Sequence, residues 1–70
     1  MSIVKLFPKN LKRLRAERQI SQSVLANRTK LSVSYVSMLE RGERTPPLDT
    51  LEIIAKALKV TPGTMLEKTT

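Results

Sequence analysis

The pattern that most restricts the fold of this chain is a pair of helix-start signals eleven residues apart. Ser21 and Ser32 each follow an apolar residue, and each has another apolar residue four positions further along. This is the pattern of a helix N-cap with a hydrophobic staple. The apolar pairs are Ile20 with Leu25 and Leu31 with Val36. The spacing predicts two short helices joined by a tight turn, and such a helix-turn-helix places its second helix in the major groove of DNA.

Apolar spacing and chain-breaking residues predict three further helices and no strand, so the expected fold class is all-α. Proline is favourable at the first position of a helix, so the first helix is expected from about Pro8 to Gln19. Gly42 and the prolines that follow it end the third helix, which is expected over about 32–41. The last two helices are expected over about 48–59 and 62–67, with Thr61 as the N-cap of the second.

Composition limits the chemistry of the chain. Its 70 residues allow one small domain over 1–70, and the absence of Cys and His removes disulfides, thiolate metal sites and the usual general base. The six acidic residues are scattered among bases, so we expect no enzyme, no metal and no cofactor. No apolar run approaches the roughly 20 residues of a membrane-spanning helix. We therefore expect a cytoplasmic protein without a membrane partner.

The positive charge lies in the first part of the chain. Residues 1–30 contain eight basic residues and one acidic residue, whereas residues 31–70 contain five of each, so the whole net charge of +7 lies in the first part. Such asymmetry indicates a polyanionic partner. Charge alone leaves three alternatives open: an ordinary solvated face, RNA, or anionic lipid.

The third predicted helix divides into two faces at about 100° per residue. Val36 and Leu39 share the inward arc. The opposite side carries Ser34, Ser37, Met38 and Arg41, with Val33 and Tyr35 at its margins. Serine bonds a base donor or acceptor, and valine or methionine contacts a thymine methyl group. The alternative is a solvent-exposed face with incidental serines, but an exposed methionine beside Val33 and Tyr35 is unusual without a partner.

Glu40 also falls on the inward arc, where an unpaired carboxylate is costly. On the first helix, Arg15 stands to Leu11 and Leu14 as Glu40 stands to Val36 and Leu39. The sequence therefore predicts an internal salt bridge between Arg15 and Glu40. The alternative is that both side chains extend to water.

Several polar residues are candidate contacts to the DNA backbone. Gln22 lies at the start of the second helix, where free N–H groups attract phosphate, and its amide can bond a phosphate or brace the third helix. The basic candidates are Arg28, Lys30, Arg41 and Arg44. Contacts of this kind position a protein without reading sequence.

At these residues the chain resembles the lambda repressor-like, Cro/C1-type (XRE) helix-turn-helix regulators. The match covers about residues 7–67. The matching segments are Leu11-Lys-Arg-Leu-Arg15, Ile20-Ser-Gln22, Leu25-Ala26, Leu31-Ser32, Val36-Ser-Met-Leu-Glu-Arg-Gly42, Pro46, Leu51 and Ala57-Leu58-Lys-Val-Thr61. The resemblance implies a compact five-helix domain that binds operator DNA as a dimer and usually represses, sometimes activates, transcription.

The resemblance also implies roles for single positions. Together with the helix faces, it gives three sets of candidate residues. Base contacts are expected from Val33, Ser34, Ser37 and Met38. Backbone contacts are expected from Ser21, Gln22, Ser32, Tyr35, Arg41 and Arg44. Dimer contacts are expected around residues 62–66, at Pro62, Thr64 and Met65, and from the loop before the fourth helix. The family also has an internal ion pair at the positions of Arg15 and Glu40.

The chain departs from the family pattern at three points. Most members have glycine in the turn where this chain has Lys30, so this lysine is expected to adopt a positive φ or to change the turn. Val24 replaces the usual glutamate of a capping box, which leaves Ser21 to cap alone. Arg41 is the one strong donor of the recognition face, so specificity is expected to depend partly on DNA shape.

The sequence thus predicts an operator-binding repressor that acts as a dimer on double-stranded DNA, with helix 32–41 in the major groove. Its half-sites would lie roughly 34–36 Å apart, one helical turn. Three alternatives stay open: a restriction–modification controller, an antitoxin that also binds a partner protein, and a helical adaptor whose basic face binds protein or RNA. Affinity that falls steeply with salt favours the DNA-binding interpretations.

Overall fold

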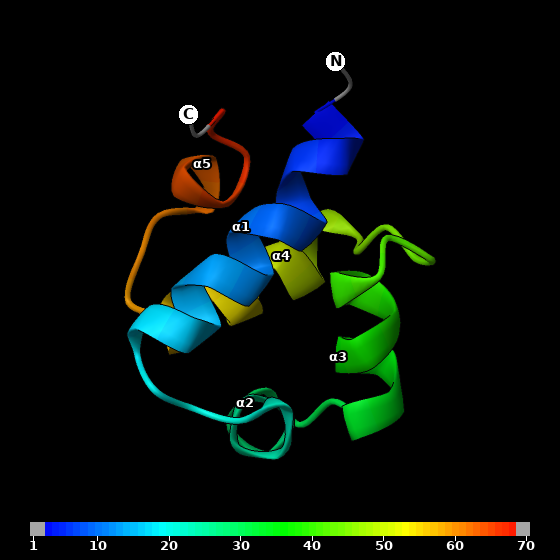
Figure 1. Ribbon diagram of the computed structural model, residues 1–70, viewed down its shortest axis with the longest axis vertical. Helices are drawn as coiled ribbons and strands as arrows, with labels where there is room; N and C mark the ends of the chain where they lie inside the picture. The colour runs from blue at the N-terminus through cyan, green and yellow to red at the C-terminus, as the bar shows by residue number, and fades with distance from the viewer. Residues whose placement is uncertain (1–2, 69–70) are drawn as a thin grey trace.

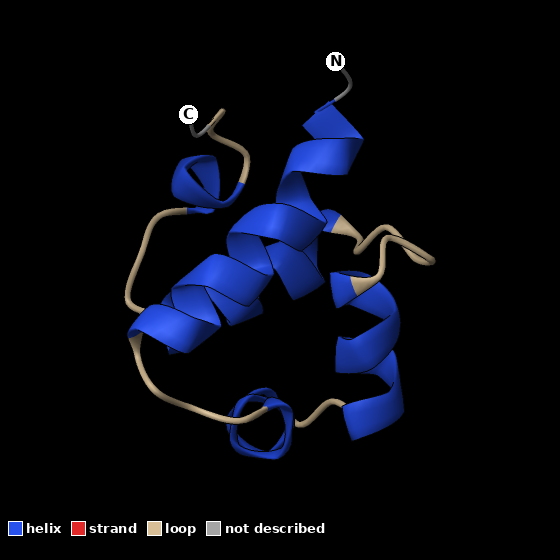
Figure 2. Cartoon of the chain, viewed as in Figure 1, coloured by secondary structure: helices blue, strands red, loops and turns tan. Residues whose placement is uncertain are grey.

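Helices account for most of the chain, as the sequence predicts, and no strand occurs among the residues that the computed structural model describes, 3–68 (Figures 1 and 2). Within this range, no helix combines the length and apolar character needed to cross a membrane. The helices are α1 (Ile3–Glu17), α2 (Gln22–Thr29), α3 (Val33–Glu40), α4 (Leu48–Ala57) and α5 (Pro62–Met65).

The predicted start of the first helix was wrong. α1 begins at Ile3, and Pro8 lies inside the helix instead of opening it. Proline has no N–H to donate to the carbonyl of residue 4, so this position weakens the helix. Burial of Phe7 favours the earlier turn nonetheless, because this residue lies on the same core-facing stripe as Leu11 and Leu14.

The predicted ends of three helices were too late by two residues. α1 ends at Glu17 and α4 at Ala57, since Gln19 and Lys59 adopt φ values of 55° and 59° that no right-handed helix contains. α5 ends at Met65 instead of residue 67. A left-handed residue at a helix end allows the last carbonyl groups of the helix to accept hydrogen bonds. Glycine marks such a position in a sequence, whereas glutamine or lysine at the same position does not indicate where the helix ends.

The helices close around one core. α3 packs against α1 and α2, α2 also contacts α4, and α5 contacts both α1 and α4. Figure 1 shows α2 and α3 joined by a short turn, with α3 at the margin of the molecule and no other helix beyond it in this view. The buried apolar residues are Phe7, Leu11, Leu14, Leu25, Ala26, Val36, Leu39, Leu51, Ile54, Ala55, Leu58 and Met65. This arrangement holds the inner face of α3 and leaves its outer face open.

Asn10 is a buried polar residue in this core, and its amide joins α1 to the end of α5 and the residues just after it. Its Nδ2 donates to the carbonyl oxygens of Met65 and Glu67 at 2.9 and 2.8 Å. Nothing in the local sequence around Asn10 indicates these partners, which lie 55 and 57 residues away. A buried polar group is tolerated here because its donors are used.

Replacing Asn10 with alanine is expected to lower the free energy of unfolding by about 1–3 kcal/mol, because two carbonyl groups lose their donor. Urea denaturation measures the change. The neighbouring exposed Lys9, replaced with alanine, is the control and is expected to shift stability by less than about 0.5 kcal/mol. Equal effects of the two variants would contradict the structural role of Asn10.

Both predicted N-caps are present. Ser21 Oγ accepts from the amide of Val24, and Ser32 Oγ accepts from the amide of Tyr35, each at 3.0 Å. Between the two helices, Lys30 adopts φ 60° and ψ 30°, the left-handed conformation expected if the turn is kept. The amide of Leu31 then donates to the carbonyl of Ala26 at 2.9 Å and closes the end of α2.

Replacing Lys30 with glycine is expected to raise the free energy of unfolding by about 0.5–1 kcal/mol. The left-handed conformation costs a non-glycine residue roughly 1–2 kcal/mol, which exceeds the added entropy of glycine in the unfolded chain. The same substitution at Lys56, inside α4, is the control and is expected to destabilise by about 1 kcal/mol. Thermal melts of both variants check the opposite signs.

Candidate nucleic-acid interface

The outer face of α3 presents the four side chains expected to meet bases. α3 begins where Ser32 caps it, so Val33 and Ser34 lie in its first turn and are exposed, Val33 at 43%. Ser37 and Met38 are half-buried one turn later. The more exposed of these four positions therefore lie at the N-terminal end of the helix. This end has the apolar and hydroxyl groups that contact base edges in a major groove.

The predicted ion pair fixes the other side of α3. Arg15 Nε lies 2.6 Å from Glu40 Oε2, and Arg15 Nη2 lies 3.0 Å from Glu40 Oε1. The Glu40 side chain is only 4% exposed and that of Arg15 18%, so the alternative in which both extend to water is wrong. Arg15 Nη1 also donates to the carbonyl of Ile20 at 2.9 Å. One guanidinium thus connects α1, the segment before α2, and the end of α3.

Gln22 takes the bracing role rather than lying free at the helix start. Its Nε2 donates to Glu40 Oε1 at 3.1 Å. Since Glu40 ends α3, this bond connects the first turn of α2 with the last turn of α3. The two helices of the motif are therefore joined by side chains as well as by the turn.

The pKa of Glu40 reflects these contacts. Burial raises it, but hydrogen bonds from Arg15 and Gln22, with the charges of Arg15 and Lys12, outweigh burial and hold the pKa below its ordinary value. The hydrogen bond to Glu40 in turn raises the pKa of Arg15 above its ordinary value. The pair stays ionised at neutral pH.

Arg41, the strong donor of the predicted DNA-contacting face, already has a partner. Its Nε and Nη2 donate to the two carboxylate oxygens of Glu43 at 2.7 and 3.0 Å, and Nη1 donates to Ser37 Oγ. The hydrogen bond from Arg41 lowers the pKa of Glu43. Gly42, with φ 75°, turns the chain between them.

Glu43, the partner of Arg41, is not among the residues that the sequence patterns predicted for this surface. The sequence does contain a signal for this pair. Opposite charges flank Gly42, and a glycine that ends a helix turns the chain so that the residues before and after it lie on the same side.

The remaining candidate backbone residues lie at the surface or its edge. Arg28, Lys30 and Arg44 are exposed. Ser21 and Ser32 are exposed too, with the hydroxyl oxygen accepting the cap bond and the hydroxyl hydrogen available to donate. Tyr35 is half-buried and packs partly against the core.

The three residues expected at a dimer interface differ in their exposure to solvent. Pro62 is exposed and Thr64 half-buried, with Thr61 Oγ1 and Thr64 Oγ1 3.0 Å apart. Met65 is fully buried in the core. The expectation that its side chain forms a dimer contact was therefore wrong, because the packing of α5 against α1 and α4 encloses it.

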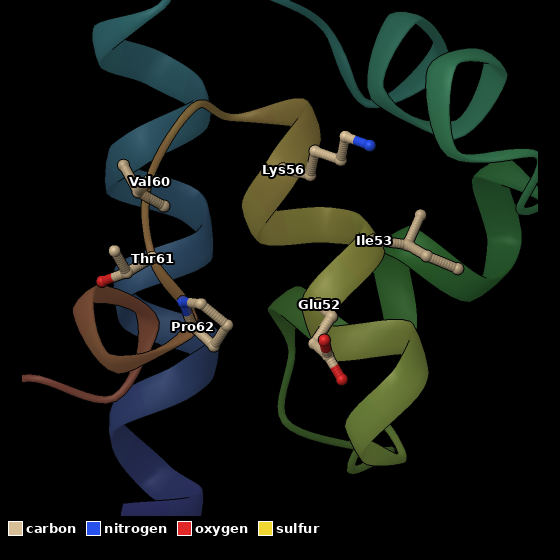
Figure 3. Close-up of a pocket in the computed structure, with 6 residues that line it drawn as sticks. All are labelled: Glu52, Ile53, Lys56, Val60, Thr61 and Pro62. Carbon is tan, nitrogen blue, oxygen red and sulfur yellow. The ribbon is translucent and has the colours of Figure 1, made fainter.

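A shallow hollow lies between α4 and the start of α5, on a part of the surface that includes Pro62 (Figure 3). Ile53, which is 48% exposed, is its largest apolar side chain. The residues that line the hollow are Glu52, Ile53, Lys56, Val60, Thr61 and Pro62. Figure 3 shows Ile53 and Lys56 extending from α4 and Pro62 at the start of α5. Of the residues that line the hollow, only Pro62 was among the predicted dimer contacts.

Known proteins resemble this chain in sequence over most of its length. The family model described as Helix-turn-helix matches residues 11–64. The HTH-type transcriptional regulator y4dJ of Sinorhizobium fredii is 42% identical over 60 residues, 86% of this chain and 78% of the relative. The control protein C.BamHI of Bacillus amyloliquefaciens is 39% identical over 66 residues, 93% of this chain and 82% of the relative.

A solved structure extends the likeness to three dimensions. The restriction-modification controller protein C.AhdI from Aeromonas hydrophila superimposes with a TM-score of 0.83 at 36% identity, over 90% of this chain and 94% of the other. The five-helix architecture and the order of its elements are therefore shared with a protein of similar length.

Proposed function

Because the chain belongs to the Helix-turn-helix family, we propose that it regulates transcription by binding DNA sequence-specifically through α3. The observation that carries the proposal is the division of α3. Its inner side is fixed by the buried core and by the Glu40 ion pair, and its outer side leaves Val33 and Ser34 exposed at the N-terminal turn. A fixed helix with an open N-terminal turn suits docking in a major groove.

The contacts follow from the chemistry of each side chain. Val33 and Met38 contact thymine methyl groups, and Ser34 and Ser37 bond donors or acceptors on base edges. Ser21, Ser32, Tyr35 and the basic residues around Arg41 hold the phosphate backbone. Gln22 contributes by holding the two helices together as well as through the free N–H groups at the start of α2. In this mode the protein acts as a repressor by occupying an operator in the cytoplasm.

A two-fold operator requires two copies, and the hollow beside α4 supports a dimer. Ile53 and Pro62 both line this hollow and expose apolar surface there. A second copy seated on this surface buries Ile53. The α3 helices of the two copies then bind half-sites about one helical turn apart, roughly 34–36 Å.

Replacing Ile53 with glutamate is expected to convert the dimer into a monomer, because the carboxylate has no partner in an apolar contact. Sedimentation equilibrium over a concentration series measures the change. Val24→Glu is the matched control, since Val24 is also β-branched and 38% exposed but lies on α2. A wild-type protein that remains monomeric with and without DNA would contradict the dimer.

Two of the similar proteins give a second candidate within the same function. C.BamHI is a control protein and C.AhdI a restriction-modification controller, and this chain covers most of the length of each. The protein is then the controller of a restriction–modification operon. The other two alternatives differ from this controller in their partners. An antitoxin also binds a partner protein, and a helical adaptor binds no DNA site.

Selection of bound sequences from random double-stranded DNA tests the proposal. A two-fold site is expected to be enriched, and its affinity is expected to fall with salt at a logarithmic slope of about −0.9 for each phosphate contacted. Enrichment of no site, together with salt-insensitive binding to a protein, would favour the adaptor and overturn the proposal.

A further inference from the structure

A row of lysines follows α1 beside α3. Lys5, Lys9 and Lys12 are spaced by four and three residues, so they lie on one face of the helix. All three are exposed, and no carboxylate of residues 3–68 lies within 4.0 Å of them. α1 packs against α3, and the charge of Lys12 contributes to lowering the pKa of Glu40 at the end of α3. This concentration of uncompensated charge lies outside the residues assigned to DNA above.

At the N-terminal end of this row, α1 meets the end of α3 around a small hollow. It is lined by Lys5 and Pro8 from α1 and by Arg41 and Gly42. The two elements approach closely, since a Cβ on Gly42 would lie 3.6 Å from Pro8 Cγ. Two cationic side chains therefore line one depression together with a proline and a glycine.

The contact with Glu43 shows that Arg41 binds an anionic group with two oxygens. The guanidinium binds its carboxylate through two parallel N–H groups, the geometry that also suits two oxygens of a phosphate. Both side chains of this pair are about half exposed, at 54% and 52%. Exposed ion pairs are weak and screened by salt, so an incoming anion exchanges with Glu43 readily.

We propose that the hollow between Lys5 and Arg41 is a seat for one backbone phosphate of the DNA, and that Glu43 occupies Arg41 until the DNA arrives. The proposal rests on the proposed function, because docking of α3 in a groove brings its two ends near the phosphate strands that border the groove. The hollow at the end of α3 then meets a strand, and the lysine row of α1 continues along it.

The test compares three variants on the selected DNA site over a salt series. Lys5→Gln is expected to weaken binding by up to about fivefold and to reduce the salt slope by about one. Lys68→Gln removes the same charge from an exposed residue after α5 and is expected to change neither quantity. Glu43→Gln is expected to strengthen binding, because Arg41 no longer has an internal partner. Unchanged thermal melts verify that each variant is folded.

Duplexes with a single neutral methylphosphonate at successive positions locate the seat. At one position, neutralisation is expected to weaken the wild-type protein more than Lys5→Gln, because the variant contacts that phosphate through Arg41 alone. Equal behaviour of Lys5→Gln and Lys68→Gln, or weaker binding of Glu43→Gln, would overturn the seat while salt-dependent binding of the wild type upholds the proposed function. Absence of any DNA site for the wild type would instead defeat the proposed function.

Discussion

Replacing Glu40 with glutamine is expected to lower the free energy of unfolding by about 3 kcal/mol. The substitution leaves Arg15, whose side chain is largely buried, without its counter-charge, and breaking a buried pair by removing one partner costs roughly 3–5 kcal/mol. Residual exposure of Arg15 places the expected value at the lower end. Denaturation with urea at neutral pH gives the measurement. Glu43→Gln, which breaks an exposed pair, is the matched control and is expected to leave the midpoint almost unchanged.

A double-mutant cycle measures the interaction energy between Arg15 and Glu40 apart from their contacts with other residues. Arg15→Met and Glu40→Gln are each expected to destabilise, and the double variant is expected to be more stable than the sum of the two losses predicts. A coupling energy near zero would contradict the account in which this pair connects α1 to α3.

The same pair gives a pH dependence with a definite sign. The pKa of Glu40 is lower in the folded protein than its ordinary value of 4.5, so its ionisation stabilises the fold above that value. The stability difference between wild type and Glu40→Gln is therefore expected to be constant from pH 7 to about pH 5. It is expected to shrink as the pH falls below 4.5 through the lower folded pKa. A difference that grows on acidification would contradict this sign.

Replacing Ser34 with glutamate is expected to weaken DNA binding by at least about 100-fold, equivalent to about 2.8 kcal/mol. Ser34 is exposed in the first turn of α3, where the helix dipole favours a carboxylate, so the fold is expected to keep its stability. In a major groove the same carboxylate is directed toward a strongly negative surface. Binding isotherms and thermal melts separate the two effects.

Ser34→Gln is the control for side-chain size without charge. It is expected to reduce affinity much less than the glutamate variant and to alter which bases are preferred. If both variants bound the selected site as tightly as the wild type, α3 would not be the element that enters the groove.

Local rules predicted much of this structure. Cap signals and helical spacing placed α2 and α3 correctly, and the wheel positions of Arg15 and Glu40 predicted their ion pair, because the direction of a side chain on a helix depends only on its own sequence position. The left-handed conformation of Lys30 was one of two outcomes that the family resemblance left open, because most members have glycine at this position.

What the sequence did not predict depends on how the helices cross. Phe7 extends α1 past Pro8 because it is buried by other elements. Asn10 finds its partners more than 50 residues away, and Met65 is enclosed because α5 packs on two helices. The Arg41–Glu43 pair required the loop conformation at Gly42. No periodicity within a helix contains this information.

Contact of DNA with the start of α2 and the outer face of α3 can be measured residue by residue. The labelled protein is titrated with its selected duplex, and the chemical shift of each backbone amide is followed. The largest shifts are expected on residues 21–22, 32–38 and 41–44, with a second group at Lys5 and Lys9. Shifts concentrated on the outer side of α4 around Ile53, with α3 unchanged, would contradict this expectation.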